Sequence, residues 1–214
     1  MTYRLAIFDF DGTLADSVDY FLGAVNECAD RFGFRRIEPH EVEALRGYDA
    51  ARMVEHLRAP MWKMPLIARH MRARMGTDIA RITLFPGVER MLRELTAAGI
   101  RIAIVTSNSE ENVRRVLGPA NAALVHHFGC GASVFGKAPK LRKALRATGV
   151  PAEQALSIGD EIRDLQASRA AGIAFGAVAW GFTTPDALRA HGPDTVFESM
   201  EEMTERLTSG LAPA

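Results

Sequence analysis

The stretch Leu5-Ala6-Ile7-Phe8-Asp9-Phe10-Asp11-Gly12-Thr13 decides the fold of this 214-residue chain. Its first four residues are all apolar, which is typical of a strand that is buried on both faces inside a parallel sheet. The chain then turns acidic at Asp9 and Asp11. An extended backbone directs these two carboxylates to the same side, while Phe8 and Phe10 point into the packing. The stretch therefore predicts a central strand that ends in a pair of carboxylates.

Apolar runs of the same kind recur further along the chain, at residues 100–105, 155–158 and 173–178. Helical patterns separate these runs, and each pattern stops at a glycine: 87–98 before Gly99, 110–117 before Gly118, and 162–171 before Gly172. A glycine just past a helix is the usual C-terminal signal. Strands that alternate with helices in this way predict an α/β fold, with a doubly wound, Rossmann-like parallel sheet.

Residues 16–83 break this rhythm. From about Asp16 to Thr83 the apolar side chains follow helical spacing, and no convincing strand is visible. The stretch is too long for a simple connection between two strands. We therefore expect a small α-helical cap domain of residues 16–83, inserted into a core domain that is made of residues 1–15 and 84–214.

The overall composition limits the classes of partner. Lys and Arg together number 26, as do Asp and Glu, so the formal net charge is zero. Nucleic acids and anionic membranes favour proteins with a basic excess, so we expect neither as a partner. The two cysteines, Cys28 and Cys130, lie far apart, and no segment is apolar for long enough to span a membrane. We expect a soluble, cytoplasmic protein, either a monomer or a homodimer, that acts on a small molecule.

Polar residues follow three of the four predicted strands. They are Asp9 and Asp11 after the first strand, Thr106-Ser107-Asn108 after the second, and Gly159-Asp160-Glu161 after the third. Ligands of open parallel sheets bind at the carboxyl ends of the strands, so we expect these residues to meet at one edge. Each set alone is also explained as a turn or a helix cap. Their meeting at one edge is better explained by a reaction site.

Asp9, Asp11 and Asp160, with Asp164 one helical turn beyond, would bring several negative charges into a small space. Like charges that close repel one another unless a cation lies among them or some of them are protonated. A few oxygen ligands that leave room for water suit Mg²⁺ better than zinc or copper. The sequence therefore predicts Mg²⁺ as the cofactor.

An anionic ligand would complete such a site. The segment Thr106-Ser107-Asn108 precedes the helix predicted from Glu110, so its hydroxyls, amide and backbone N–H groups are placed to hold a phosphate. Lys137, in Gly136-Lys137-Ala138-Pro139, would neutralise both the carboxylates and the phosphoryl oxygens if it is buried. Lys140 and Lys143 are alternatives to it, and a solvated surface lysine is the commoner case.

The segment Asp9-Phe10-Asp11-Gly12-Thr13-Leu14-Ala15-Asp16-Ser17 resembles the first signature of the haloacid dehalogenase-like (HAD) hydrolase superfamily, in its phosphatase branch. Thr106-Ser107-Asn108 resembles the second motif, Lys137 the third, and the six residues Gly159-Asp160-Glu161-Ile162-Arg163-Asp164 the fourth. Lys137 is followed by Ala138, where the family often has proline. The nearest subgroup is that of the phosphoglycolate-phosphatase-like proteins, which share an entry of the Phe85-Pro86-Gly87-Val88 type after a helical C1-type cap.

This resemblance implies a Mg²⁺-dependent phosphatase for a small phosphorylated metabolite, such as phosphoglycolate or a sugar phosphate. Asp9 would form an aspartyl-phosphate, and Asp11 would protonate the leaving alcohol and then take a proton from water. The residues implied to hold the metal are Asp9, Asp11 through its backbone carbonyl, Asp160 and Asp164, with Asp164 acting directly, through a water, or by orienting Lys137. Those implied to act with them on the phosphoryl group are Thr106 and Lys137, with Gly12, Ser107 and Asn108 as further phosphate or substrate contacts.

Other activities fit parts of the same pattern. A phosphomutase of the β-phosphoglucomutase type shares the first motif, and a non-catalytic binding protein could keep the scaffold. A haloacid dehalogenase needs no metal, and the second acid, Asp11, argues against it. A phosphonatase would require a cap lysine for Schiff-base chemistry, and Lys63, the only lysine in the cap segment, has no flanking motif.

Overall fold

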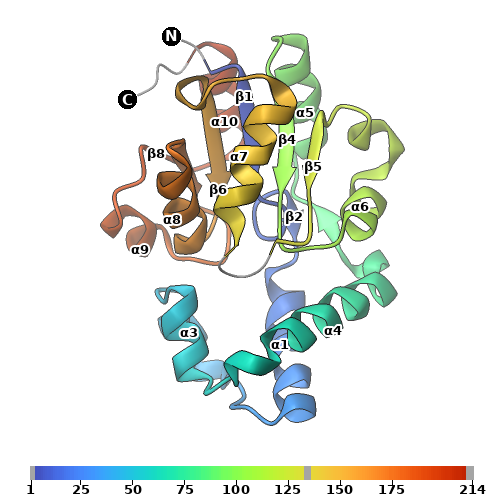
Figure 1. Ribbon diagram of the computed structural model, residues 1–214, viewed down its shortest axis with the longest axis vertical. Coiled ribbons are helices and arrows are strands. Elements are labelled where there is room, and N and C mark those ends of the chain that lie inside the picture. Colours follow the sequence, from blue (N-terminus) through green and yellow to red (C-terminus); the bar gives the residue numbers. More distant parts are fainter. Residues whose placement is uncertain (1–2, 133–135, 211–214) are drawn as a thin grey trace.

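The computed structural model describes residues 3–132 and 136–210, which form a parallel sheet between two layers of helices (Figure 1). The six strands of the sheet lie in the order β5-β4-β1-β6-β7-β8. Their bounds are β1 (Leu5–Phe8), β4 (Arg101–Val105), β5 (His127–Gly129), β6 (Ala155–Gly159), β7 (Ala174–Val178) and β8 (Thr195–Phe197). β1 lies between β4 and β6 and pairs with both in parallel register. The predicted α/β fold with a parallel sheet is confirmed.

Side chains of β1 alternate between the two layers. Ala6 and Phe8 lie in a cluster with α5 (Val88–Ala97), α6 (Glu110–Ala122) and α10 (Met200–Thr208). Leu5 and Ile7 lie in a second cluster with α7 (Lys137–Thr148) and α8 (Ile162–Ala171). These four β1 side chains are fully buried. The short helix α9 (Pro185–Ala190) packs with α8 against β7. Both faces of the sheet are therefore covered, as a doubly wound fold requires.

The glycines predicted to end helices do so, with one exception. Gly172 follows α8 in the left-handed conformation, with φ 71°, and ends that helix. Gly118 has φ 71° and ψ 165°, which are not helical, but the chain resumes a helical course at Pro119 and continues to Ala122. The predicted helix end at Gly118 is therefore a kink inside α6.

The inserted segment is largely helical, and it lies beside the carboxyl ends of the sheet strands (Figure 1). Its helices are α1 (Val18–Phe32), α2 (Val42–Leu45), α3 (Ala50–His56) and α4 (Met64–Thr77), with single 3₁₀ turns at Pro39–Glu41, Met61–Lys63 and Ile79–Arg81. The expectation of no strand is wrong at its two ends, where β2 (Ala15–Asp16) pairs antiparallel with β3 (Thr83–Leu84). Two-residue strands carry no recognisable pattern. The division into two domains stays a prediction.

The insert has an apolar cluster of its own, centred on Val25, Ile37, Leu45 and Leu57. It also contacts the core through Arg46, whose guanidinium donates to the carbonyl oxygens of Phe182 at 2.8 Å and of Gly181 at 3.3 Å. None of the helices in residues 3–132 and 136–210 combines the length and apolar character needed to cross a membrane.

The close packing of the sheet against its helices can be tested at Gly176 in β7. A Cβ atom there would lie 2.6 Å from Cε2 of the fully buried Phe197, which has no room to move. We expect Gly176→Ala to lower the free energy of unfolding by about 1–3 kcal/mol, as measured by urea denaturation. The matched control is Gly23→Ala in α1, where a Cβ would meet nothing within 4 Å. That control should be neutral or stabilising by up to about 1 kcal/mol, and equal losses in both variants would contradict the packing described.

Candidate active site

The carboxyl ends of β1, β4 and β6 carry the polar side chains that the sequence places at one edge. Asp9 follows β1, and its N–H donates to the carbonyl oxygen of Ile158 at 2.8 Å, so the sheet ladder still fixes the backbone there. Thr106 directly follows β4, and Asp160 directly follows β6. Asp9, Thr106 and Asp160 are all buried. The structure therefore brings these three positions together at the point where the strand order reverses, which is where open α/β sheets bind ligands.

Lys137 provides the positive charge at this edge. It is the first residue of α7, and its Nζ lies 2.9 Å from Oδ2 of Asp9 and 2.5 Å from Oδ1 of Asp164. The alternative lysine, Lys140, donates instead to the carbonyl oxygen of Cys130 at 2.6 Å. The geometry thus selects Lys137 over Lys140 as the lysine at the carboxylates. The cap lysine, Lys63, donates to the carbonyl oxygen of Phe32.

Three carboxylates form a group with the geometry of a metal site. Asp9, Asp160 and Asp164 each offer an oxygen, and these oxygens all lie within 4.8 Å of one another. Asp160 is oriented by two hydrogen bonds, from the Thr13 hydroxyl to Oδ1 and from the Phe182 N–H to Oδ2, both 2.8 Å long. Hard, anionic oxygen donors that are fixed in this way fit Mg²⁺. The carboxylate of Asp11 lies outside this group, so the backbone carbonyl of Asp11 is its one remaining predicted metal contact.

Two glycines leave the room that this arrangement needs. A Cβ on Gly12 would lie 2.3 Å from Oδ2 of Asp160, and the φ of +74° at Gly12 is itself unfavourable for other residues. A Cβ on Gly181 would lie 2.0 Å from the Cβ of Asp160. The Gly12 N–H donates to the carbonyl oxygen of Ala15 within a turn. The close approach of Asp160 and the positive φ thus explain why a glycine stands at position 12. Its predicted part in substrate binding stays a prediction.

Asp11 is held away from the other acids by neighbours of its own. The Asn108 side-chain amide donates to both carboxylate oxygens of Asp11, at 3.3 and 3.1 Å, and the Ser17 hydroxyl donates to Oδ1 at 3.2 Å. Asn108 is in turn oriented by the Asn112 side chain, which donates to its Oδ1 at 3.0 Å. The carboxylate of Asp11 therefore stands beside the cluster of Asp9, in a position suited to exchange a proton with a bound ligand.

The remaining predicted phosphate contacts lie at the same edge. The Thr106 hydroxyl accepts a hydrogen bond from the Asn108 N–H at 3.1 Å, and the Ser107 carbonyl accepts one from Arg72 at 3.2 Å. Ser107 lines the cavity beside the site. Their binding of phosphate stays a prediction, as do the catalytic roles of Asp9 and Asp11.

Burial dominates the electrostatics of the cluster. It raises the pKa of Asp9 to about 7, with Lys137 acting in the opposite direction and Asp164 adding to the rise. Burial also raises the pKa of Asp160 well above its usual range, and the negative charges of Glu161, Asp164 and Asp9 raise it further. The pKa of Asp11 is raised by burial too, while the hydrogen bonds from Ser17 and Asn108 lower it. The site therefore favours either protons or a cation.

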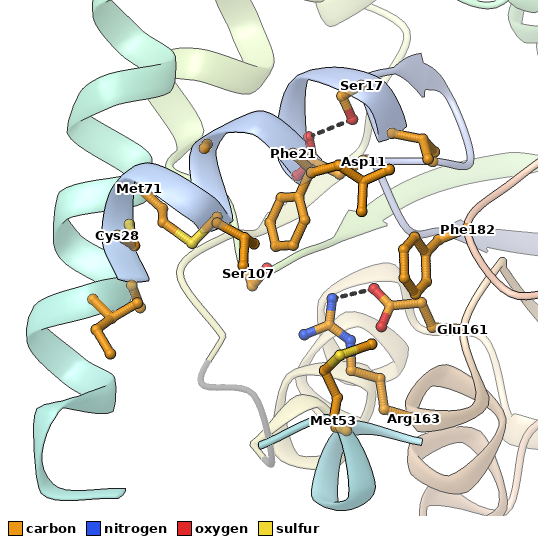
Figure 2. A pocket seen from close by; sticks show the side chains of 18 of the residues that line it. Asp11, Ser17, Phe21, Cys28, Met53, Met71, Ser107, Glu161, Arg163 and Phe182 are labelled. Carbon is orange, nitrogen blue, oxygen red and sulfur yellow. Dashed lines mark hydrogen bonds and ion pairs between the residues drawn. The ribbon is translucent and has the colours of Figure 1, made fainter. Parts of the chain in front are cut away.

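Sequence reasoning gave no role to Arg163, which lies in the fourth motif. Its guanidinium pairs with Glu161 and, like Asp11 and Phe182, lines the cavity (Figure 2). The signal was present, because an arginine one residue before Asp164 on the first turn of α8 must lie near the same strand edge. Thr13, which orients Asp160, was likewise quoted within the first motif without a role.

The central strand of this parallel α/β sheet ends in a buried carboxylate, and that carboxylate pairs with a lysine from a following helix. Together these features define a class of hydrolases with an acidic reaction centre. A family model described as "Haloacid dehalogenase-like hydrolase" matches residues 6–178, which include Asp9, Thr106, Lys137 and Asp160. The chain belongs to the haloacid dehalogenase-like hydrolase family. The resemblance found in the motifs is thus confirmed.

Individual relatives cover nearly the whole chain. A phosphoglycolate phosphatase of Synechococcus elongatus is 28% identical over 203 residues, which make up 94% of this chain and 96% of the relative. Protein CbbY of Cereibacter sphaeroides is 30% identical, with 92% of each chain covered. Among solved structures, a putative phosphoglycolate phosphatase of Lactobacillus plantarum has a TM-score of 0.81 at 23% identity, covering 96% of this chain and 99% of that one. CbbY of Rhodobacter sphaeroides in complex with phosphate has a TM-score of 0.71 at 27% identity, covering 92% and 95%.

The acidic cluster predicts how metal affinity depends on pH. A carboxyl whose pKa is raised to about 7 is protonated below that pH in the folded, metal-free protein, so Mg²⁺ must displace a proton there. We expect the rise in Tm caused by Mg²⁺, relative to the same protein in chelator, to be small near about pH 5 and larger near about pH 8. An equal rise at both pH values would contradict metal binding at Asp9.

Proposed function

We propose that this protein is a Mg²⁺-dependent phosphatase that hydrolyses a small phosphorylated metabolite through an aspartyl-phosphate on Asp9. The observation that carries the proposal is the position of the Lys137 ammonium between Asp9 and Asp164, with an oxygen of Asp160 within 4.8 Å of an oxygen of each of these acids. A positive charge at that place balances the negative charge of the Asp9 nucleophile, so that the site can accept a dianionic ester. The family, and relatives that are named phosphoglycolate phosphatases, support the same reaction class.

In the first step the Asp9 carboxylate attacks phosphorus, and the bond from phosphorus to the ester oxygen breaks. Asp11, whose pKa is raised by burial, gives its proton to the departing oxygen. The hydrogen bonds from Asn108 and Ser17 hold this carboxyl in place during the transfer. Lys137 and Thr106 are placed to stabilise the phosphoryl oxygens.

In the second step Asp11, now ionised, takes a proton from a water molecule, and the resulting nucleophile attacks phosphorus. The acyl phosphate bond breaks, so inorganic phosphate is released and the Asp9 carboxylate is restored. Two moderate barriers thus replace one that is very high in water.

Asp9, Asp160 and Asp164, with the backbone carbonyl of Asp11, are the groups that would hold Mg²⁺. When bound, this cation supplies Lewis-acid stabilisation of the negative charge on the transferring phosphoryl group. The three carboxylates fit it because their oxygens lie close together, and because the raised pKa values of Asp9 and Asp160 show that each of these groups favours a bound proton or a cation over bare ionisation. The complex of CbbY with phosphate, a protein of the same fold, supports a phosphate site on this scaffold.

The proposal is tested by phosphate release from a panel of phosphorylated metabolites and an aryl phosphate, with Mg²⁺ and with chelator. Turnover is expected only with Mg²⁺. We expect Asp9→Asn to lower kcat by about a thousandfold or more, because the amide cannot attack phosphorus. The matched control is Asp30→Asn, which removes an exposed carboxylate on α1 that pairs with Arg36, and it should leave kcat unchanged.

Metal-independent turnover, or normal activity in Asp9→Asn, would contradict the mechanism. A phosphomutase would instead interconvert sugar phosphates faster than it releases phosphate, and would need a bisphosphate activator. A binding protein would show saturable ligand binding without turnover in the same panel.

A further inference from the structure

A cavity of about 240 Å³ opens from the acidic cluster into the inserted helices. Asp11, Gly12 and Asp160 line one end of it, together with Ser107 and Asn108. Figure 2 shows Phe21, Cys28 and Met71 following from Asp11 along the insert, with Met53 opposite them. The space therefore begins at Asp11, the residue proposed to protonate the departing oxygen. Under the proposed function, the alcohol part of the ester is the group that would extend into it.

The cavity extends along two helices of the insert. Val18 and Cys28 both line it, and they are ten residues apart on α1, a distance of about 15 Å along a helix. Met64 and Met75, which both line it from α4, are separated by about 16 Å in the same way. A leaving group as short as glycolate ends two carbons from the ester oxygen. It would leave most of this length unfilled.

The walls of the cavity within the insert are apolar. The side chains that α1 and α4 contribute include Leu22, Val25, Ile67, Ala68 and Met71. Within the described stretch 16–83, two charged residues line the space, and both are engaged with backbone groups. Asp49 accepts a hydrogen bond from the Arg52 N–H at 2.8 Å, and Arg72 donates to the carbonyl oxygen of Ser107 at 3.2 Å.

Most of the charged residues that line the cavity thus lie at the phosphoryl end, where Arg163 and Glu161 join Asp11 and Asp160. A sugar hydroxyl or a carboxylate that entered the insert would lose its hydrogen bonds to water and gain few in return. An alkyl chain or a ring would gain by burial, because apolar area would leave water on both partners. Phe21, which is 45% exposed although it lines this space, is one side chain that such a ligand would cover.

We infer that the alcohol released by this phosphatase is apolar, an alkyl chain or an unsubstituted ring, and that it lies between α1 and α4 during the reaction. The inference rests on the proposed function and assigns its substrate class. Methionine side chains at Met53, Met64, Met71 and Met75 suit this role, since unbranched thioethers adapt to ligands of different shape.

The test compares kcat/KM, with Mg²⁺ present, for the monophosphates of straight-chain alcohols from methyl to octyl, and for phosphoglycolate and glucose 6-phosphate. We expect kcat/KM to rise about fourfold with each methylene until the cavity is full, which corresponds to the burial of one methylene group. Hexyl phosphate should then exceed both phosphoglycolate and glucose 6-phosphate.

A pair of substitutions on α4 places the chain within the cavity. Ala68→Phe, which fills part of the space, should lower kcat/KM for octyl phosphate at least about tenfold more than for methyl phosphate. Ala73→Phe adds the same bulk at an exposed position of α4 outside the lining and should leave the whole series unchanged.

The outcomes separate this inference from the proposed function. A rate that does not depend on chain length, or that is highest for phosphoglycolate or glucose 6-phosphate, overturns the apolar leaving group and leaves the phosphatase reaction standing. Equal effects of Ala68→Phe on octyl and methyl phosphate overturn the placement between α1 and α4. If no ester in the series or in the metabolite panel releases phosphate, the proposed function itself is wrong and this inference falls with it.

Discussion

The ion pairs of Lys137 with Asp9 and Asp164 are the interaction on which the rest of the site depends. Burial alone would lower the pKa of this lysine, but the negative charges of Asp164 and Asp9 raise it above its usual value, so the ammonium stays charged inside the protein. One buried cation does not balance three carboxylates whose oxygens lie within 4.8 Å. The cluster therefore has more carboxylates than cations, which favours the binding of either protons or a divalent cation.

The fold explains why these groups can meet at all. Asp9 and Asp160 follow adjacent strands, and Lys137 begins a helix that packs on the sheet face formed by Leu5 and Ile7. The backbone of Phe182 donates to Asp160 and accepts from Arg46 of the insert, so one loop contacts both Asp160 and the insert. Through this loop, the position of the insert is tied to the reaction centre.

Much of the core could be predicted because burial leaves a strong pattern. A run such as residues 5–8 is apolar on both faces only in the middle of a covered sheet, and the carboxyl ends of such strands then identify Asp9, Thr106 and Asp160 as neighbours. β5 and β8 escaped prediction because each has three residues and lies at an edge, where one side has no partner strand. The choice between Lys137 and Lys140 also needed coordinates, since both lie on the same helix and differ only in the direction that each side chain takes. The cavity in the insert was beyond sequence reasoning for a related reason: an amphipathic helix has one apolar face, whether that face packs against its neighbours or lines a space.

Under the proposed function, the core of this protein would supply the chemistry and the insert the room for the leaving group. The central claim is that the phosphoryl group passes through Asp9. The most direct measurement is to mix the protein with substrate and Mg²⁺, quench in acid during turnover, reduce with borohydride, and sequence the peptides by mass spectrometry. Because borohydride converts an acyl phosphate of aspartate to homoserine, the account predicts homoserine at position 9. Reduction at another residue, or none while phosphate is being released, would contradict it.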